Sequence, residues 1–141
     1  MLALTGFNPV TSQGTHRFIK SDDLKAAVWL GAVDDLWELG KPTGKGGPWK
    51  NTNIKAGEWS DPYLMTGYDK RSLSLSHNAD NAVTFELQID LTGTGMWRTF
   101  KEFKLSKGAS SEYWFPTAFQ AYWARIRTDC NCQATAQFNY D

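Results

Sequence analysis

Aromatic side chains are the most unusual chemical feature of this sequence. The chain has 7 Trp, 5 Tyr and 8 Phe, which together make 14% of its residues. Sugar rings stack on indole and phenol rings, which offer a large contact area at a small cost in conformational entropy. Trp49, Trp59 and Tyr63 lie in a loop-like stretch, with Asn51 and Asp61 between them. This mixture predicts a glycan-binding edge, unless the rings only seal one end of a folded core.

A second candidate lies near the carboxyl end of the chain. Trp123, Arg125 and Arg127 alternate with the apolar Ala124 and Ile126, and the apolar set is expected to face the core. Trp123 and Arg125 then lie on the opposite face and offer a flat ring beside a cation. In the alternative, a loop covers this face as well, so that Trp123 belongs to the core and Arg125 caps a buried carboxylate.

Catalytic chemistry is less well supported. A glycosidase needs two carboxylates about 5–10 Å apart across a cleft, and a chain of 141 residues leaves little room for one. His16 and His77 are the only histidines, and no serine or cysteine stands in a nucleophile motif. We therefore expect a binding protein rather than an enzyme, with a small glycan-active hydrolase or lyase as the third choice. The carboxylates available to that third choice are Asp34, Asp35, Glu38, Glu58 and Asp61.

Metal sites are only weakly indicated. No cofactor is expected, although aspartates together with backbone carbonyls leave structural calcium open. Cys130 and Cys132 are separated by one residue, a spacing that strains an intrachain disulfide and gives only two of the four ligands of a zinc site. We expect loop thiols, with a strained or an intermolecular disulfide as the alternatives. The aspartates considered for calcium are Asp22, Asp23, Asp34, Asp35 and Asp61.

Charge and length exclude several function classes. Lys plus Arg and Asp plus Glu are 15 each, so nucleic acid is not expected as a partner. No stretch approaches the roughly 20 apolar residues that cross a bilayer, so membrane insertion is not expected either. Residues 1–6 are too short for a secretory signal, which in an exported protein would lie upstream.

Alternation of apolar and polar residues predicts strands over the second half of the chain. Residues 83–91 alternate with period two, and a glycine-rich turn returns the chain into residues 97–105. This register sets Phe85 opposite Phe103. Residues 73–76 are expected to pair with the first of these strands and to complete a three-stranded meander.

The last thirty residues predict a further hairpin. Residues 122–126 and 134–140 each present small and aromatic side chains on one face, and pairing them sets Ile126 beside Ala136. Residues 112–115 add a short strand. Strands at a spacing of about ten residues predict an all-β fold, an antiparallel β-sandwich of the immunoglobulin-like or jelly-roll type.

The first part of the chain allows two interpretations. Residues 15–19 and 26–30 predict a hairpin, and residues 33–39 a short helix. The alternative is a single helix over residues 21–40. The turn-rich segment KPTGKGGP, residues 41–48, marks a boundary.

This boundary gives the expected domain organisation. Residues 1–44 form an N-terminal arm or hairpin, which can also be the end of an upstream domain. Residues 45–141 form the sandwich core, and residues 1–141 together are expected to make one structural domain.

The run GGPWKNTNIKAGEWSDPYLMTGYDKRSLSLSH (Gly46–His77) and the closing ATAQFNY carry a family resemblance. They resemble domains attached to larger exported bacterial proteins, and the chain is similar in style to β-sandwich carbohydrate-binding modules. This resemblance implies a secreted or cell-surface accessory domain with a non-catalytic role and sugar contacts through Trp and Tyr.

The predicted function is therefore the binding of a polysaccharide or oligosaccharide through exposed aromatic residues. The alternative is a structural domain whose aromatic surface packs against a partner domain or a second copy of the chain. The predicted contact residues are Trp49, Trp59, Asp61, Tyr63, Trp123 and Arg125.

Overall fold

The computed structural model describes residues 1–12, 17–39 and 43–141, with the backbone alone for residues 37–39. The chain divides into two compact units, Met1–Lys41 and Pro42–Asp141. Thr15 and His16, at the start of the predicted hairpin, lie outside the described residues, and so do the side chains of Trp37 and Glu38.

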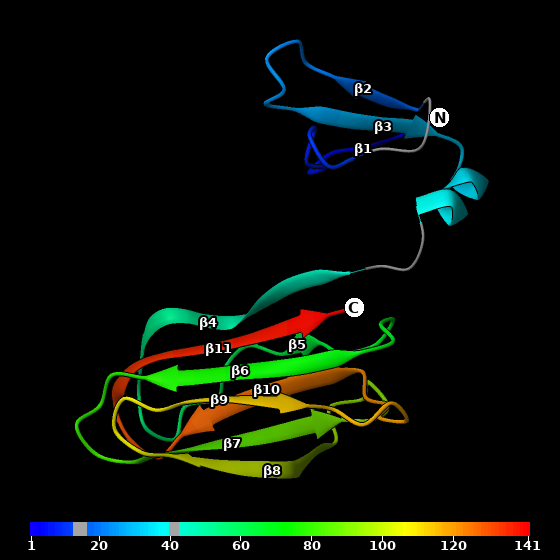
Figure 1. The fold of residues 1–141 in the computed structure, drawn as a ribbon. Helices are drawn as coiled ribbons and strands as arrows, with labels where there is room; N and C mark the ends of the chain where they lie inside the picture. Colours follow the sequence, from blue (N-terminus) through cyan, green and yellow to red (C-terminus); the bar gives the residue numbers. More distant parts are fainter. Residues whose placement is uncertain (13–16, 40–42) are drawn as a thin grey trace. The chain divides into compact units, whose positions relative to one another are not determined.

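The N-terminal unit contains an antiparallel sheet in the order β1-β3-β2 (Figure 1). Its elements are β1 (Leu2–Leu4), β2 (Phe18–Lys20), β3 (Ala27–Gly31) and the 3-10 helix η1 (Val33–Leu39), the short helix expected there. The pairing of Phe18 with Trp29 confirms the predicted hairpin. A single helix over residues 21–40 is wrong, because the Ser21 hydroxyl accepts the N–H of Lys25 and closes a turn between β2 and β3.

The second unit is a sandwich of two four-stranded sheets (Figure 1). The β11 sheet has the order β4-β11-β6-β9, and the β10 sheet has the order β5-β10-β7-β8; each is named after a central strand. The strands are β4 (Gly44–Ile54), β5 (Tyr63–Leu64), β6 (Arg71–His77), β7 (Val83–Asp90), β8 (Trp97–Leu105), β9 (Ser110–Trp114), β10 (Trp123–Thr128) and β11 (Cys132–Tyr140).

The strand order is that of a jelly roll. Among these eight strands, β7 and β8 are the only consecutive pair that lies in one sheet, and every other loop crosses to the opposite sheet. All pairings are antiparallel, as the prediction of an antiparallel β-sandwich requires. Eight strands in two such sheets make the jelly-roll form of the sandwich.

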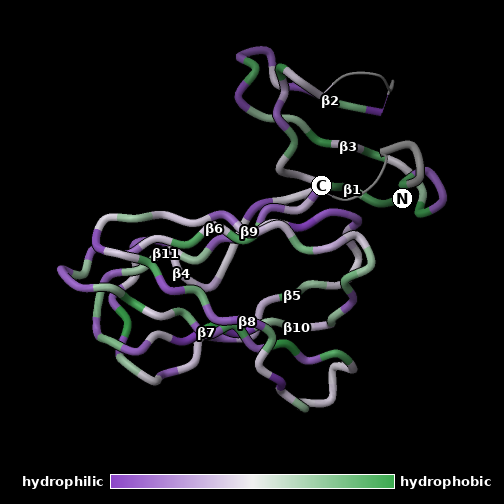
Figure 2. The backbone as a smooth tube through the Cα atoms, turned by 60° about the horizontal axis from the view of Figure 1, so that its bottom comes forward, coloured by the Kyte–Doolittle hydropathy of each residue, from purple (hydrophilic) through white to green (hydrophobic). Residues whose placement is uncertain are grey.

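The core lies between the two sheets and follows the period of the strands. Leu73 and Leu75 on β6 and Val83, Phe85 and Leu87 on β7 are almost completely buried, while the residues between them in β7 are half-buried. Hydropathy accordingly changes from residue to residue along the strands (Figure 2). Because alternate residues point to opposite faces, one face of each sheet is apolar and the other is free for polar side chains.

Two predicted strand pairings are wrong. β10 does not pair with β11 but lies between β5 and β7, while β11 lies between β4 and β6. Likewise β6 and β7 belong to different sheets, so the expected meander is not formed. Ala124 and Ala136 are nevertheless buried and face the core as predicted. Alternate residues of a strand point to the core whether the next strand pairs with it in a hairpin or lies in the facing sheet. Tyr122, expected on that core face, is exposed.

The β7–β8 pairing confirms the predicted register from Val83 to Leu87, and beyond Leu87 the register is shifted by one residue. Phe85 stands opposite Phe103, and a β-bulge after Leu87 leaves Phe100 as an extra residue. Phe100 is half-buried and packs against the core. The Lys101 ammonium lies 4.7 Å from the centroid of the Tyr113 ring, a cation–π contact.

β4 begins inside the turn-rich segment KPTGKGGP, which the sequence predicts as a boundary. A Cβ atom on Gly47 would lie 2.1 Å from the carbonyl oxygen of Ala136 on β11, and a Cβ on Gly46 would lie 2.0 Å from the Tyr63 hydroxyl. These glycines therefore allow the backbone of β4 to approach its neighbours closely.

Candidate functional site

The outer face of the β10 sheet gathers three of the six predicted contact residues. Cross-strand partners point to the same face of a sheet, so the pairings of β10 with β7 and of β7 with β8 define rows across it. The first row contains Trp123, Asp90 and Trp97, the second Arg125, Gln88 and Thr99, and the third Arg127, Glu86 and Glu102. Together with Trp59 we call these residues the tryptophan–arginine face.

Trp59 reaches this face from the loop between β4 and β5. Ser60, the next residue, is buried and holds the loop on β10: its backbone N–H donates to the Ile126 carbonyl over 2.8 Å, and its hydroxyl accepts the Ile126 N–H over 3.0 Å. Trp59 is thereby half-buried, with the guanidinium carbons of Arg125 and Arg127 4.3 and 4.4 Å from its ring centroid. The loop is thus fixed on the sheet by a reciprocal pair of hydrogen bonds.

Arg125 lies at the centre of the face. Its guanidinium stacks on Trp59 and also on Trp97, at 4.4 Å, and its Nε and Nη2 donate to the Gln88 side-chain oxygen over 3.1 and 2.8 Å. Burial, and then the nearby charge of Arg127, lower its pKa, while Glu86 acts in the opposite direction. Among the described residues, no carboxylate lies within 4.0 Å of Arg125, so the alternative in which it caps a buried carboxylate is not realised.

Arg127 and Glu86 neutralise each other in the third row. Arg127 Nη2 and Nε lie 2.6 and 2.7 Å from Glu86 Oε2, and the Thr99 hydroxyl donates to the other carboxylate oxygen over 2.7 Å. Burial alone would raise the pKa of Glu86, but the hydrogen bonds from Thr99 and Arg127 prevail and lower it. An open hollow of about 460 Å³ beside this pair is also lined by Glu102 and Asp129.

Trp123 contributes a ring to the first row that no cation among the described residues covers. It is half-buried, between Leu64 on β5 and Asp90 on β7, and no cation stacks on it in the part of the chain that the structure describes. The Asp90 carboxylate is turned away, since it accepts the backbone N–H groups of Gly93 and Gly95 over 3.0 and 2.7 Å. The ring of Trp123 therefore has an aliphatic neighbour on one side and, on the other, a carboxylate whose oxygens bind backbone N–H groups.

The other predicted contact residues lie elsewhere. Trp49 is only 7% exposed and belongs to the core. Tyr63 is half-buried and stacks on Phe138 with 5.5 Å between ring centroids. Asp61 is exposed, next to Ser60. The rings of Trp49 and Tyr63 thus belong to the core or pack against it.

Seven residues of the face were not predicted as contacts. Arg127 follows Trp123 and Arg125 on the same face of β10, whereas Gln88 and Trp97 join them only because β10 pairs with β7 and because β8 carries a bulge. The signal in the sequence was the alternation over residues 84–90, in which polar residues, Gln88 among them, stand between the core residues. Trp114 was also missed: it is 57% exposed on the edge strand β9, away from this face.

The structure describes the surroundings of several of the carboxylates and thiols considered above. No three His, Cys, Asp or Glu side chains among the described residues lie together as metal ligands. Asp35 forms an ion pair with Arg17. Cys130 and Cys132 are both half-buried free thiols, and burial and the proximity of Cys130 raise the pKa of Cys132 to about 11.

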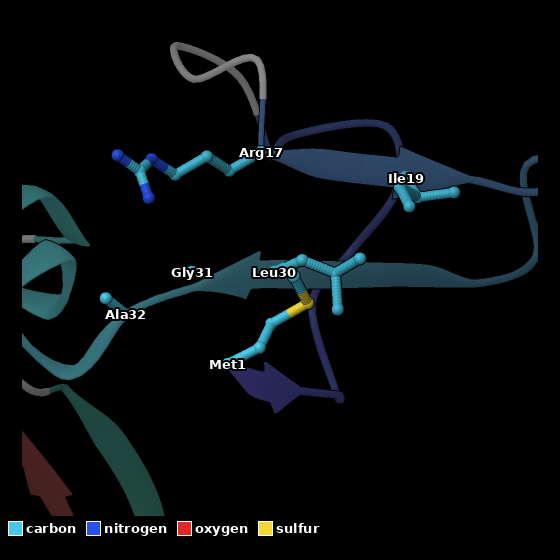
Figure 3. Close-up of a pocket in the computed structure, with 6 residues that line it drawn as sticks. All are labelled: Met1, Arg17, Ile19, Leu30, Gly31 and Ala32. Carbon is cyan, nitrogen blue, oxygen red and sulfur yellow. The ribbon is translucent and has the colours of Figure 1, made fainter.

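The N-terminal unit has a hollow of its own, of about 550 Å³. It is lined mainly by aliphatic groups of Met1, Ile19 and Leu30 (Figure 3). Its charged group, Arg17, is paired with Asp35. The hollow holds neither a stacking ring nor an acid–base pair, so the tryptophan–arginine face is the better candidate.

No protein-family model matches the chain, and no curated protein is significantly similar to it. No helix among the described residues combines the length and hydropathy required to cross a membrane.

Proposed function

We propose that the unit Pro42–Asp141 is a non-catalytic module that binds polysaccharide or oligosaccharide on the tryptophan–arginine face. The observation that carries this proposal is the placement of three half-buried indoles, Trp59, Trp97 and Trp123, on one outer sheet face. A set of rings gathered on one face with interleaved polar groups is a typical binding surface.

The polar residues between the rings suit a ligand rich in hydroxyl groups. Gln88 and Thr99 occupy the row beside Trp123 and Trp97. Amide and hydroxyl groups both donate and accept hydrogen bonds. Gln88 and Thr99 already bind Arg125, Glu86 and each other, so a sugar hydroxyl would bind here in exchange for one of these hydrogen bonds. The aromatic rings exclude water from one side of the sugar, which strengthens these hydrogen bonds.

Binding is favoured over hydrolysis by the state of the carboxylates. Glu86 and Glu102 are cross-strand partners, but the lowered pKa of Glu86 keeps it ionised at neutral pH. A general acid for glycoside cleavage needs a raised pKa instead. We expect the bound polysaccharide to lie outside the cell, so the proposal includes an accessory role on a secreted or cell-surface protein.

The test is affinity electrophoresis of the full chain through gels that contain single glycans. The Trp123→Ala variant is expected to bind about fivefold to a hundredfold more weakly, if a sugar ring stacks on indole as well as a nucleobase does, a contact worth on the order of 1–3 kcal/mol. The matched control is Trp114→Ala, on the other sheet, which should bind as the unchanged chain does. Absence of retardation on every glycan, or equal loss in both variants, would overturn the proposal.

A second candidate function is assembly through an aromatic surface. It is favoured by Trp114, whose ring is unusually exposed for a tryptophan on a sheet edge. Light scattering separates the two functions: a mass that grows with protein concentration, and that falls in Trp114→Ser but not in Trp123→Ala, favours assembly.

A further inference from the structure

Arg125 keeps one edge of its guanidinium free. Nε and one hydrogen of Nη2 are used by Gln88. Nη1 donates to no described residue and is not a buried unpaired atom. The edge formed by Nη1 and Nη2 is therefore open to solvent and carries two parallel N–H groups, the arrangement that binds both oxygens of a carboxylate.

The two indoles on Arg125 restrict the direction from which a partner can arrive. Trp59 and Trp97 each lie within 4.5 Å of its guanidinium carbon, at 4.3 and 4.4 Å. A group that reaches this cation must come in along its open edge and not over its stacked surface. A flat, two-oxygen anion fits such an approach, and the same stacking holds the arginine in one orientation before the anion binds.

The charges around Arg125 leave its own charge uncompensated. The cross-strand partner of Arg125 is Gln88. Its neutral amide does not balance the charge of the guanidinium as a carboxylate would. Arg127 is already paired with Glu86, and the Asp90 carboxylate is taken up by backbone N–H groups. The exposed Glu102 belongs to the following row. Arg125 therefore has no ion-pair partner among the described residues, and its charge can be met by an anion at its open edge.

From this geometry we infer that the glycan bound here contains uronic acid residues, with the sugar ring on Trp123 and its carboxylate on the open edge of Arg125. The inference rests on the proposed function and specifies its ligand class. Trp123 and Arg125 are two positions apart on one strand, so their Cα atoms are separated by about 6.7 Å on the same face. A ring and the carboxylate attached to it can contact both side chains over this span.

The experiment compares polygalacturonate and alginate with their carboxyl-reduced, neutral forms, and uses dextran sulfate as an anion without carboxylates. Binding to the full chain is measured by affinity electrophoresis and calorimetry. At least one uronate polymer is expected to bind about tenfold to a hundredfold more tightly than its reduced form. Arg125→Gln should abolish that preference, Arg125→Lys should restore only part of it, and Lys50→Gln, the same charge change on the other sheet, should leave it intact.

The outcomes separate the inference from the function on which it rests. If reduced polymers or neutral glycans bind as tightly as the uronates, or if dextran sulfate competes equally well, the uronate inference is wrong while glycan binding stands. If no glycan binds, both fail. Thermal unfolding of each variant shows whether it is folded.

Discussion

At the level of single residues, the sandwich holds two of its buried charges with backbone groups instead of opposite charges. Arg71, 3% exposed, donates from Nε to the Met65 carbonyl over 2.6 Å and from Nη1 to the Phe119 carbonyl over 3.0 Å. Asp90, 1% exposed, accepts backbone N–H groups of the turn that follows β7. Both side chains thus fix loops to the sheets, which is a structural role.

Replacing Arg71 by Met should lower the free energy of unfolding by about 2–4 kcal/mol. The change leaves the buried carbonyls of Met65 and Phe119 without donors, and each orphaned group costs about 1–3 kcal/mol. Urea denaturation followed by tryptophan fluorescence measures the effect. Arg98→Met, at an exposed position of β8, is the control, and equal midpoints for both variants would show that Arg71 is not a structural anchor.

Asp90 should make stability depend on pH in the acid range. Burial alone would raise its pKa, but N–H groups of Gly95, Thr92 and Gly93 prevail and lower it. A carboxyl with a lowered pKa in the folded state stabilises the fold above its unfolded pKa of about 3.9, and this stabilisation is lost as the pH falls through the folded pKa. The expected result is a drop in the urea midpoint below about pH 4 that is smaller in Asp90→Asn. An identical slope in the variant would contradict this prediction.

At the level of elements, alternation predicts which side of each strand is buried, but not which strand lies beside it. Val83 and Phe85 face the core as predicted, and so do Ala124 and Ile126, because burial is recorded in the order of residues along one strand. Partner choice is not local. Consecutive strands often pair, as β7 and β8 do, but β10 and β11 lie in different sheets. The sequence does not distinguish a β10–β11 hairpin from the observed arrangement, because both bury the same residues.

For the candidate site, too, the sequence predicted the face of a strand but not the neighbouring strands. Trp123 and Arg125 were placed on an outer face by alternation alone. Trp97 and Gln88 could be joined to them only with knowledge of the β7–β10 pairing and of the bulge in β8. Trp49 was interpreted as a loop residue, but the glycines before it start a strand that carries its ring into the core.

The approach of β4 to β11 gives a prediction for one glycine. Gly47→Ala should destabilise the unit by at least about 2 kcal/mol, because its Cβ would lie 2.1 Å from the Ala136 carbonyl oxygen and neither backbone can move freely. Gly44→Ala is the matched control at the start of the same strand, since no atom lies within 4 Å of its Cβ. Equal unfolding midpoints for the two variants would refute the close approach.

At the level of the whole molecule, all residues of the candidate site belong to the second unit, Pro42–Asp141. Residues 42–141 expressed alone should therefore unfold cooperatively and bind the same glycans, with an affinity within about twofold of that of the full chain. Circular dichroism and calorimetry test this expectation. A fragment that folds but does not bind would show that the N-terminal unit contributes to binding.

The order of strands also determines when the second unit can be completed during synthesis. β4 is its first strand and β11 its last, and they are paired neighbours. On the ribosome β4 must therefore wait, unpaired, until almost all of the unit has been translated, and β7–β8 is the one hairpin that can form early. Refolding is expected on the millisecond-to-second scale of β-rich domains with distant pairings. Until β11 pairs with it, β4 is exposed, and chaperones or its own glycines and lysines must prevent its aggregation.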